Sequence, residues 1–440
     1  MTTAMGAALR RIQLGNALSA FGNGFTVPFL FVYVAQVRDL GSNTAGVVLA
    51  TFAVAALAVL PFIGRVIDRR GPLSVVVAGA VAAAAGSMGL GLAASEPLVI
   101  AAAGVLGAGI AAIQPALATL IVWCSTPLTR SRAFATQFFL GNLGLGVGGL
   151  LGGLLVDTSA ASSFVRLFAI DAVMFLVLGA AVATVRLAKT PVFDDPVPTA
   201  DEHLGSTGGG WRSLLGDRAM VQLCVLGFVM FFACYGQFES GLSAFAVDVA
   251  RISPSMLGVA LAANTAAIVL AQFVVLKLVE RRRRSRVIAL VGLVWTVAWC
   301  VAGSAGLVPG SQAVGITAIV SAYALFGLGE AMLSPTVAPL VADLAPSSAL
   351  GQYNSAFALV KQLALAVGPA VGGLMAGAGL YGTYIVTLIV CSLGITALAL
   401  RLGKWLTAEQ DNPLRAVAGA AVPAPRAAAS DEVTTCLLYT

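Results

Sequence analysis

Long runs of hydrophobic residues alternate with short polar breaks along most of this chain, and the charged residues fall mainly in the breaks. Crossing the hydrocarbon core of a bilayer takes about 20 apolar residues in a helix. Helices are required because lipid offers no partner for backbone N–H and C=O groups. The pattern predicts twelve transmembrane helices, at residues 13–37, 44–64, 73–94, 98–122, 134–156, 164–186, 219–243, 255–278, 287–307, 312–340, 350–376 and 380–401.

The composition supports a membrane protein. Hydrophobic residues make up 59% of the chain and charged residues only 10%, whereas a soluble domain carries roughly 25% charged residues. So few charges cannot cover a surface that faces water, which excludes an ordinary soluble protein. The 49 glycines suit helices that pack closely within a membrane.

The basic residues indicate the orientation. If both termini are cytoplasmic, the 25 Lys and Arg residues lie on the cytoplasmic side with four exceptions, namely Arg38, Arg166, Arg251 and, inside a span, Lys361. An excess of Lys and Arg in cytoplasmic loops is the usual topology signal. We therefore expect a multi-pass protein of the inner (plasma) membrane with both termini in the cytoplasm.

The two halves of the chain resemble each other. When they are aligned, Gly46 corresponds to Gly258 and Pro115 corresponds to Pro335, with similar residues around each of them. Six helices repeated in the same orientation predict an all-α membrane protein of two pseudo-symmetric six-helix bundles, with a substrate site between them. We expect a bundle at 1–187, a cytoplasmic linker at 188–217, a second bundle at 218–403 and a disordered cytoplasmic tail at 404–440.

The loop after the second predicted span carries a motif. It contains Gly64, Arg65, Asp68, Arg69, Arg70 and Gly71, followed by Pro72. The loop resembles the signature G-x-x-x-D-[RK]-x-G-[RK] of the major facilitator superfamily and departs from it only at Pro72. The resemblance implies the major facilitator fold. It also implies that this loop is a conformational latch that holds the two halves together in the outward-facing state.

The fifth span carries a second motif, formed by Gly144, Gly148, Gly149, Gly152 and Gly153. It is similar to the g-x-x-x-G-P-x-x-G-G motif of the twelve-helix drug/proton antiporter-like branch, with Gly149 in place of Pro. The resemblance implies export. Close helix packing without any bearing on direction stays the alternative. In the fourth span, Ala103 stands where many of these exporters have an Arg used in proton transfer, so that route for protons is absent.

Two ionisable residues lie near the middle of predicted spans. Glu330 and Lys361 are each roughly 15–18 Å from the cytoplasmic end of their helix at 1.5 Å per residue, and such groups mark functional sites by default. We expect a buried Glu330–Lys361 pair that a proton or the substrate breaks; a permanent structural pair is the alternative. Asp171 and Glu239 are further candidates for proton coupling.

Several uncharged polar residues in the spans are candidates for contacts with a substrate. They are Asn16, Asn23, Gln114, Asn142, Gln237, Asn264 and Tyr323. Hydrogen bonds between helices are the alternative role for each of them. A cavity with few charges and many aromatic residues suits lipophilic or weakly cationic compounds.

The sequence thus predicts a secondary active transporter that couples the efflux of small lipophilic compounds, drugs or metabolites, to protons. An importer or facilitator of the same fold is the alternative, and a membrane-embedded enzyme is remote because the single His, His203, leaves no catalytic or metal cluster. We expect no enzymatic activity, no cofactor and no metal. The expected partners are a small-molecule substrate, protons and the lipid bilayer, with no nucleic acid, and the expected state is a monomer.

Overall fold

The computed structural model describes residues 2–157, 160–186, 211–238, 240–308 and 311–414. Within these residues the protein is entirely helical, without strands, and twelve helical segments are long and apolar enough to cross a membrane. The expected fold class and number of spans are confirmed. The main elements of the first half are α1 (Thr2–Thr26), α3 (Gly41–Arg70), α4 (Pro72–Leu92), α5 (Glu96–Trp123), α6 (Arg130–Leu155) and α7 (Ala161–Ala183).

The second half is built in the same way. After the short helix α8 (Trp211–Gly216), its main elements are α9 (Arg218–Ala233), α10 (Gly241–Asp248), α11 (Pro254–Val279), α12 (Arg284–Ser304), α13 (Gln312–Leu333), α14 (Val337–Leu344), α15 (Leu350–Gly377), α16 (Tyr381–Leu402) and α17 (Ala408–Asp411).

Three of the twelve spans are interrupted helices. In the first span, α1 passes at Val27 into a short 3-10 turn that contains Pro28, then into α2 (Leu30–Val32). The seventh span is broken between α9 and α10, and the tenth is broken between α13 and α14 at Pro335. Proline breaks helices because it has no N–H to donate. Carbonyl groups at the break of the seventh span accept side-chain hydrogen bonds, that of Ala233 from Trp299 and that of Phe238 from Tyr323.

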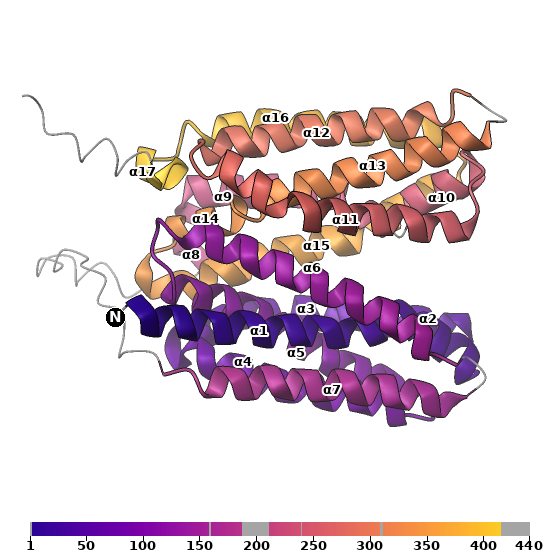
Figure 1. Cartoon of the computed structure of the whole chain (residues 1–440), viewed down its shortest axis with the longest axis horizontal. Coiled ribbons are helices and arrows are strands. Elements are labelled where there is room, and N and C mark those ends of the chain that lie inside the picture. Colours follow the sequence, from indigo (N-terminus) through magenta and orange to yellow (C-terminus); the bar gives the residue numbers. More distant parts are fainter. Residues whose placement is uncertain (1, 158–159, 187–210, 239, 309–310, 415–440) are drawn as a thin grey trace, which may run out of the picture.

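Each half has its own hydrophobic core. Buried residues between Ile12 and Val185 form one large cluster, and those between Leu214 and Leu402 form another. In Figure 1 helices α1 to α7 lie in the lower part of the view and α9 to α16 in the upper part, with all long helices running nearly parallel. The start of α1 and helix α17 lie at the same end, which we call the terminal end; the opposite one is the far end.

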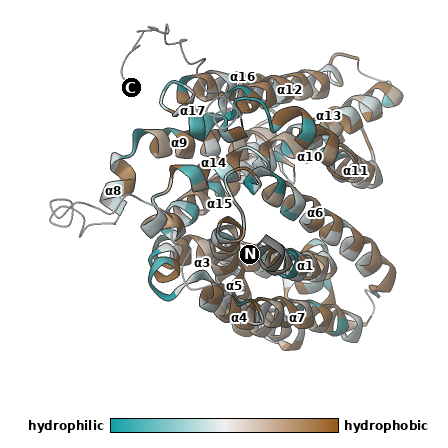
Figure 2. Ribbon diagram, turned by 60° about the vertical axis from the view of Figure 1, so that its left-hand side comes forward, coloured by the Kyte–Doolittle hydropathy of each residue, from teal (hydrophilic) through white to brown (hydrophobic). Residues whose placement is uncertain are grey.

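Hydrophobic side chains remain exposed along the helices. Phe62, Leu154 and Leu270 are 72%, 81% and 79% exposed, and hydrophobic residues run along most of the helices in Figure 2. A soluble monomer rarely exposes contiguous apolar surface on this scale. Such a surface fits a hydrocarbon environment.

The glycine motif of α6 packs this helix against α1. A side chain on Gly148 would meet the backbone of Phe21 and the Cα of Gly24, the latter at 3.2 Å, and one on Gly152 would lie 3.2 Å from the Cα of Phe25. Gly144 also faces the α1 backbone, whereas Gly149 and Gly153 are less crowded. The second half repeats the contact, since Gly368 of α15 packs against Gly236.

The prediction of a disordered tail that begins at residue 404 is wrong for residues 404–414. Residues 404–414 are ordered and include α17, where Asp411 is 1% and Asn412 5% exposed. Thr407 and Gln410 form a capping box at the start of α17, a local signal that marks a helix start. Residues 415–440 and 187–210 lie outside the described residues, so the rest of the expected tail and most of the expected linker stay predictions.

Gly148→Ala is expected to lower the thermal unfolding midpoint of the purified protein, because the added methyl group overpacks the α1–α6 contact at a cost of about 1–3 kcal/mol. Gly373→Ala is the matched control, since a Cβ there meets no atom within 4 Å and alanine favours a helix over glycine by about 1 kcal/mol. Equal midpoints for the two variants would contradict the packing role of Gly148.

Candidate functional site

Asp68, at the end of α3, bonds to the first turn of α15 in the other half. Its carboxylate accepts hydrogen bonds from the backbone N–H of Gly351 at 2.6 Å and of Gln352 at 3.1 Å, and from Nε2 of Gln352 at 3.1 Å. The first N–H groups of a helix have no partner within the helix and attract negative charge. Asp68 therefore joins the two halves by capping a helix across the boundary.

Two glycines of the same motif make this contact possible. A Cβ on Gly64 would lie 2.7 Å from the Cα of Gln352, so only glycine lets α3 approach α15 this closely. Gly71 ends α3 with φ +82°, a left-handed conformation that glycine adopts without strain. Pro72, which departs from the family signature, is the first residue of α4, a position that proline favours. Arg65, Arg69 and Arg70 are exposed.

The second half provides the counterpart of this contact. When the two halves are aligned, Glu280 corresponds to Asp68, and its partner Arg132 corresponds to Gln352. Arg132 donates from Nε at 2.9 Å and from Nη2 at 3.0 Å to the two oxygens of Glu280. These hydrogen bonds lower the pKa of the Glu280 carboxyl below its ordinary value. The two-fold repeat seen in the sequence is thus present in contacts between the halves.

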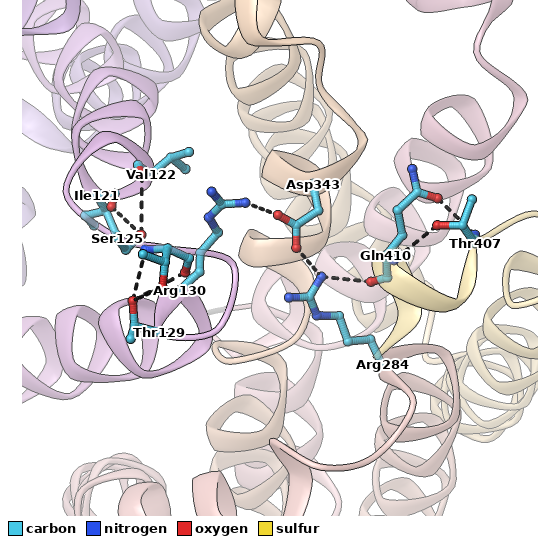
Figure 3. A network of polar contacts seen from close by, with 10 residues as sticks. Ile121, Val122, Ser125, Thr129, Arg130, Arg284, Asp343, Thr407 and Gln410 are labelled. Carbon is cyan, nitrogen blue, oxygen red and sulfur yellow. Dashed lines mark hydrogen bonds and ion pairs between the residues drawn. The ribbon is translucent and has the colours of Figure 1, made fainter. Parts of the chain in front are cut away.

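A third polar contact at the terminal end has no counterpart in the repeat. Asp343 of α14 lies between Arg130 of α6, with which it forms an ion pair, and Arg284 of α12, whose Nη1 is 2.6 Å away (Figure 3). The Arg130 and Arg284 side chains are only 5% and 4% exposed. Burying charges is costly unless they are paired, so this cluster depends on Asp343. We call the contacts of Asp68, Glu280 and Asp343 across the boundary the latch.

Helix α17 supports the latch from the C-terminal side. The Gln410 carbonyl accepts a hydrogen bond from Arg284 at 2.9 Å (Figure 3). Asp411 accepts from the backbone N–H of Ser285 at 2.8 Å and pairs with Arg283 at 2.5 Å. The sequence pattern explains these arginines only as topology signals. The one sequence feature that points to a partner for them is Asp343, an acidic residue just after the predicted tenth span.

Apolar contacts between the halves also lie toward the terminal end. Ala56, Leu60 and Ala111 cluster with Ala358 and Leu359. The Phe139 and Phe273 rings lie 4.9 Å apart between α6 and α11. At the opposite ends of α3 and α11, a Cβ on Gly46 or on Gly258 would meet no atom within 4 Å. The contacts named here hold the halves together toward the terminal end, whereas the far ends of α3 and α11 have free space beside these two glycines.

Glu330 lies inside the second half, one turn before the break at Pro335. It is 3% exposed and accepts a hydrogen bond at 2.8 Å from Nδ2 of Asn264 on α11. The hydroxyl of Tyr235, in the break between α9 and α10, also interacts with this carboxylate. Asn264 and Tyr235 are neutral, so these two partners of Glu330 bring no charge to the carboxylate.

Lys361 is the residue expected to pair with Glu330, but the two do not form an ion pair. The ion pairs of the described residues involve neither of them. Lys361 is exposed, and its Nζ lies 5.2 Å from the centre of the Phe231 ring. The expected direct pair is therefore absent from this conformation, although the charges of Lys361 and Glu330 still influence each other. Lys361 is thus accessible, whereas Glu330 is buried.

Asp171 lies within the first half rather than between the halves. It is 0% exposed and accepts hydrogen bonds from Ser87 at 2.7 Å and Thr26 at 3.3 Å, which join α7 to α4 and α1. One of its oxygens has no hydrogen-bond partner. Glu239 lies outside the described residues.

The uncharged candidates differ in their surroundings, since some form hydrogen bonds within one half whereas Gln114 faces the boundary. Gln237 and Tyr323 are buried and bond to the backbone of Phe232 and Phe238 within the second half, and Asn142 bonds to its own helix. Gln114 is exposed in the middle of α5. It follows the exposed Val105 by about two and a half turns, so the two residues lie on opposite sides of the helix.

Gln114 also shares a face with Ala111, one turn away, which contacts α15. It therefore lies on the boundary side of α5. Asn16 and Asn23 are half-buried on α1, and Asn264 is engaged with Glu330.

Comparisons with known proteins agree with this architecture. The family model of the Major Facilitator Superfamily matches residues 12–308 and again residues 248–433. No curated protein sequence matches the chain significantly. The E. coli fucose:proton symporter FucP, in its outward conformation, is structurally similar with a TM-score of 0.72 at 14% identity, over 90% of this chain and 98% of FucP.

Two further structures are similar in fold. A bacterial homologue of the iron transporter ferroportin, in the outward-facing state, has a TM-score of 0.71 at 15% identity, over 90% of this chain and 99% of the homologue. The human organic anion transporter MFSD10 has a TM-score of 0.63 at 15% identity, over 92% of this chain and 99% of MFSD10. The chain belongs to the Major Facilitator Superfamily and has the twelve-helix fold of that family's transporters.

Proposed function

We propose that the protein is a proton-coupled secondary transporter that exports small lipophilic compounds by alternating access. The observation that carries the proton coupling is the arrangement of Glu330, a buried carboxylate with neutral hydrogen-bond partners and a cation, Lys361, nearby but unpaired. Ionisable groups at membrane depth mark proton or ion pathways.

The latch supplies the conformational part of the proposal. Contacts at the terminal end combine the polar latch with small apolar clusters that can separate, whereas each half keeps its own large continuous core. Rocking of the halves would break the latch and close the far end. We place the terminal end in the cytoplasm because Arg65, Arg69 and Arg70 are exposed there, which makes this conformation outward-facing.

Export is supported by the glycine motif of α6 that resembles the drug/proton antiporter-like branch, and by aromatic residues such as Phe231 and Phe357 beside Lys361. Ala103 is fully buried and has no proton to carry. Glu330 in the second half takes over the role of proton carrier in this proposal.

A specific observation favours a second candidate, the movement of an anion together with protons. Lys361 is exposed whereas Glu330 is buried, so the cation is the more accessible of the two charged groups to a substrate. An anionic substrate bound by Lys361 benefits when a proton neutralises Glu330, which couples the two in the same direction. A cationic substrate would instead compete with the proton for Glu330, which couples them in opposite directions.

Proteoliposomes loaded with a panel of lipophilic anions, lipophilic cations and sugars test both candidates. Export predicts that an inward-directed proton gradient, acid on the outside, drives a lipophilic compound out of right-side-out vesicles. Movement of the compound into the vesicles under the same gradient supports the second candidate. Transport of all compounds that ignores the gradient would refute proton coupling.

Glu330→Gln is expected to abolish proton-driven transport while exchange of substrate across the membrane at equal pH continues, because the amide oxygen keeps the hydrogen bond from Asn264 but the amide does not bind or release a proton. Asp171→Asn is the matched control, since that carboxylate lies within the first half. The control should retain proton-driven transport. Unchanged coupling in Glu330→Gln would eliminate Glu330 as the carrier.

Asp343→Asn is expected to shift the protein toward the state open at the terminal end, because Arg130 and Arg284 lose their shared counter-charge, a change of roughly 2–5 kcal/mol for buried charge pairs. Paired spin labels on α6 and α14 report the distance between the halves. Asp248→Asn is the control, since Asp248 bonds Tyr381 within the second half. Identical distance distributions in the two variants would refute the role of Asp343 in the latch.

A further inference from the structure

The terminal end of α3 carries a pocket where this helix meets α8 and the start of α15. Its volume is about 380 Å³. The side chains of Arg65, Arg69 and Arg70 form its basic part, and Phe62 and Trp211 form an aromatic wall. Trp211 begins α8, and its Nε1 donates to the carbonyl of Pro61 at 3.1 Å. A pocket with three guanidinium groups and an aromatic wall suits a phosphate-bearing ligand with an apolar part.

The three arginines have no carboxylate of the protein to neutralise them among the described residues. The ion pairs there involve Arg130, Arg132, Arg283 and Arg284. Asp68, the only acidic residue of the motif, is bonded to the start of α15. The pocket therefore has a positive charge that a ligand or solvent ions can balance.

The pocket lies where the outer face of α3 changes from apolar to basic. Val47, Val54 and Phe62 follow one face of the helix and are 45%, 62% and 72% exposed. Arg65 and Arg69 continue this face one and two turns after Phe62. In a membrane this change marks the level of the lipid head groups, where tryptophan and arginine also concentrate.

An apolar groove adjoins the basic pocket. This second cavity, of about 400 Å³, shares Val66 and Arg70 with the first and continues along α4 and α5. Its walls are mostly small residues, including Ala78, Ala82 and Ala108. A free phosphate ion would use only the basic pocket, whereas an acyl chain would also fill the groove.

We propose that the pocket and the groove together bind one anionic phospholipid, with the head group at Arg65, Arg69 and Arg70 and an acyl chain along α4 and α5. This site lies outside the cleft and is independent of the transported substrate. Both halves contribute to it, since Trp211 and Gln352 complete the pocket formed by α3. The lipid therefore stabilises the conformation in which the latch is closed, because separation of α3 from α15 would take the pocket apart.

The test uses the full-length protein in detergent, titrated with phosphatidylglycerol and with phosphatidylcholine of the same acyl chains, and bound lipid is counted by native mass spectrometry. The variant Arg65→Gln/Arg69→Gln is expected to lose about 30-fold in affinity for phosphatidylglycerol, as two removed charges near a lipid surface predict. Arg281→Gln/Arg282→Gln is the matched control, because these exposed arginines occupy the corresponding loop of the second half.

Ala78→Phe tests the groove separately. Ala78 is exposed, so the larger side chain fills the groove without disturbing the core, and it should weaken phosphatidylglycerol binding while all arginines remain. Soluble sn-glycerol 3-phosphate is expected to compete only weakly. Equal affinity for the two lipids in the wild-type protein, or equal losses in the two arginine variants, would overturn the proposal. Binding of glycerol phosphate as tight as that of the lipid would assign the pocket to a free phosphate ligand instead.

Discussion

The conformation of this protein depends on carboxylates that reach across the boundary between its halves at one end. Asp68 caps α15, Glu280 holds Arg132, and Asp343 lies between two buried arginines. Each of these interactions joins groups that would otherwise lack a partner, namely helix N–H groups or guanidinium groups. Breaking them exposes such groups to water again, so the closed and open states of this end can differ little in free energy. That balance is what the proposed alternating access requires.

The latch combines symmetric and asymmetric parts. The contacts of Asp68 and Glu280 occupy equivalent positions of the repeat, but their chemistry differs, because Gln352 stands where the other contact has Arg132. The cluster around Asp343 has no counterpart at the equivalent positions of the repeat, and α17 reinforces it with hydrogen bonds to the start of α12. The two-fold repeat therefore provides the architecture, while the charges that set its stability have diverged between the halves.

The residues proposed to couple transport to protons lie in one half. Glu330, Asn264, Tyr235 and Lys361 belong to the second half and gather at the breaks of the seventh and tenth spans. The fourth span of the first half carries Ala103 and an unbroken helix through Pro115. The first half has one interrupted span and the second half has two, and Glu330 lies one turn before the break of the tenth span.

The sequence by itself determined the twelve spans, their repeat and the family, because bilayer thickness and the cost of unpaired backbone groups leave few alternatives for runs of apolar residues. It also singled out Asp68 from its loop motif and Glu330 from its position inside a span. Only the tertiary structure decided the partners: Glu330 bonds Asn264 rather than pairing with Lys361, and Asp171 bonds Ser87 within the first half. The reason is physical. Depth follows from position along a helix, whereas a partner depends on the rotation and packing of neighbouring helices, which residue spacing alone does not fix.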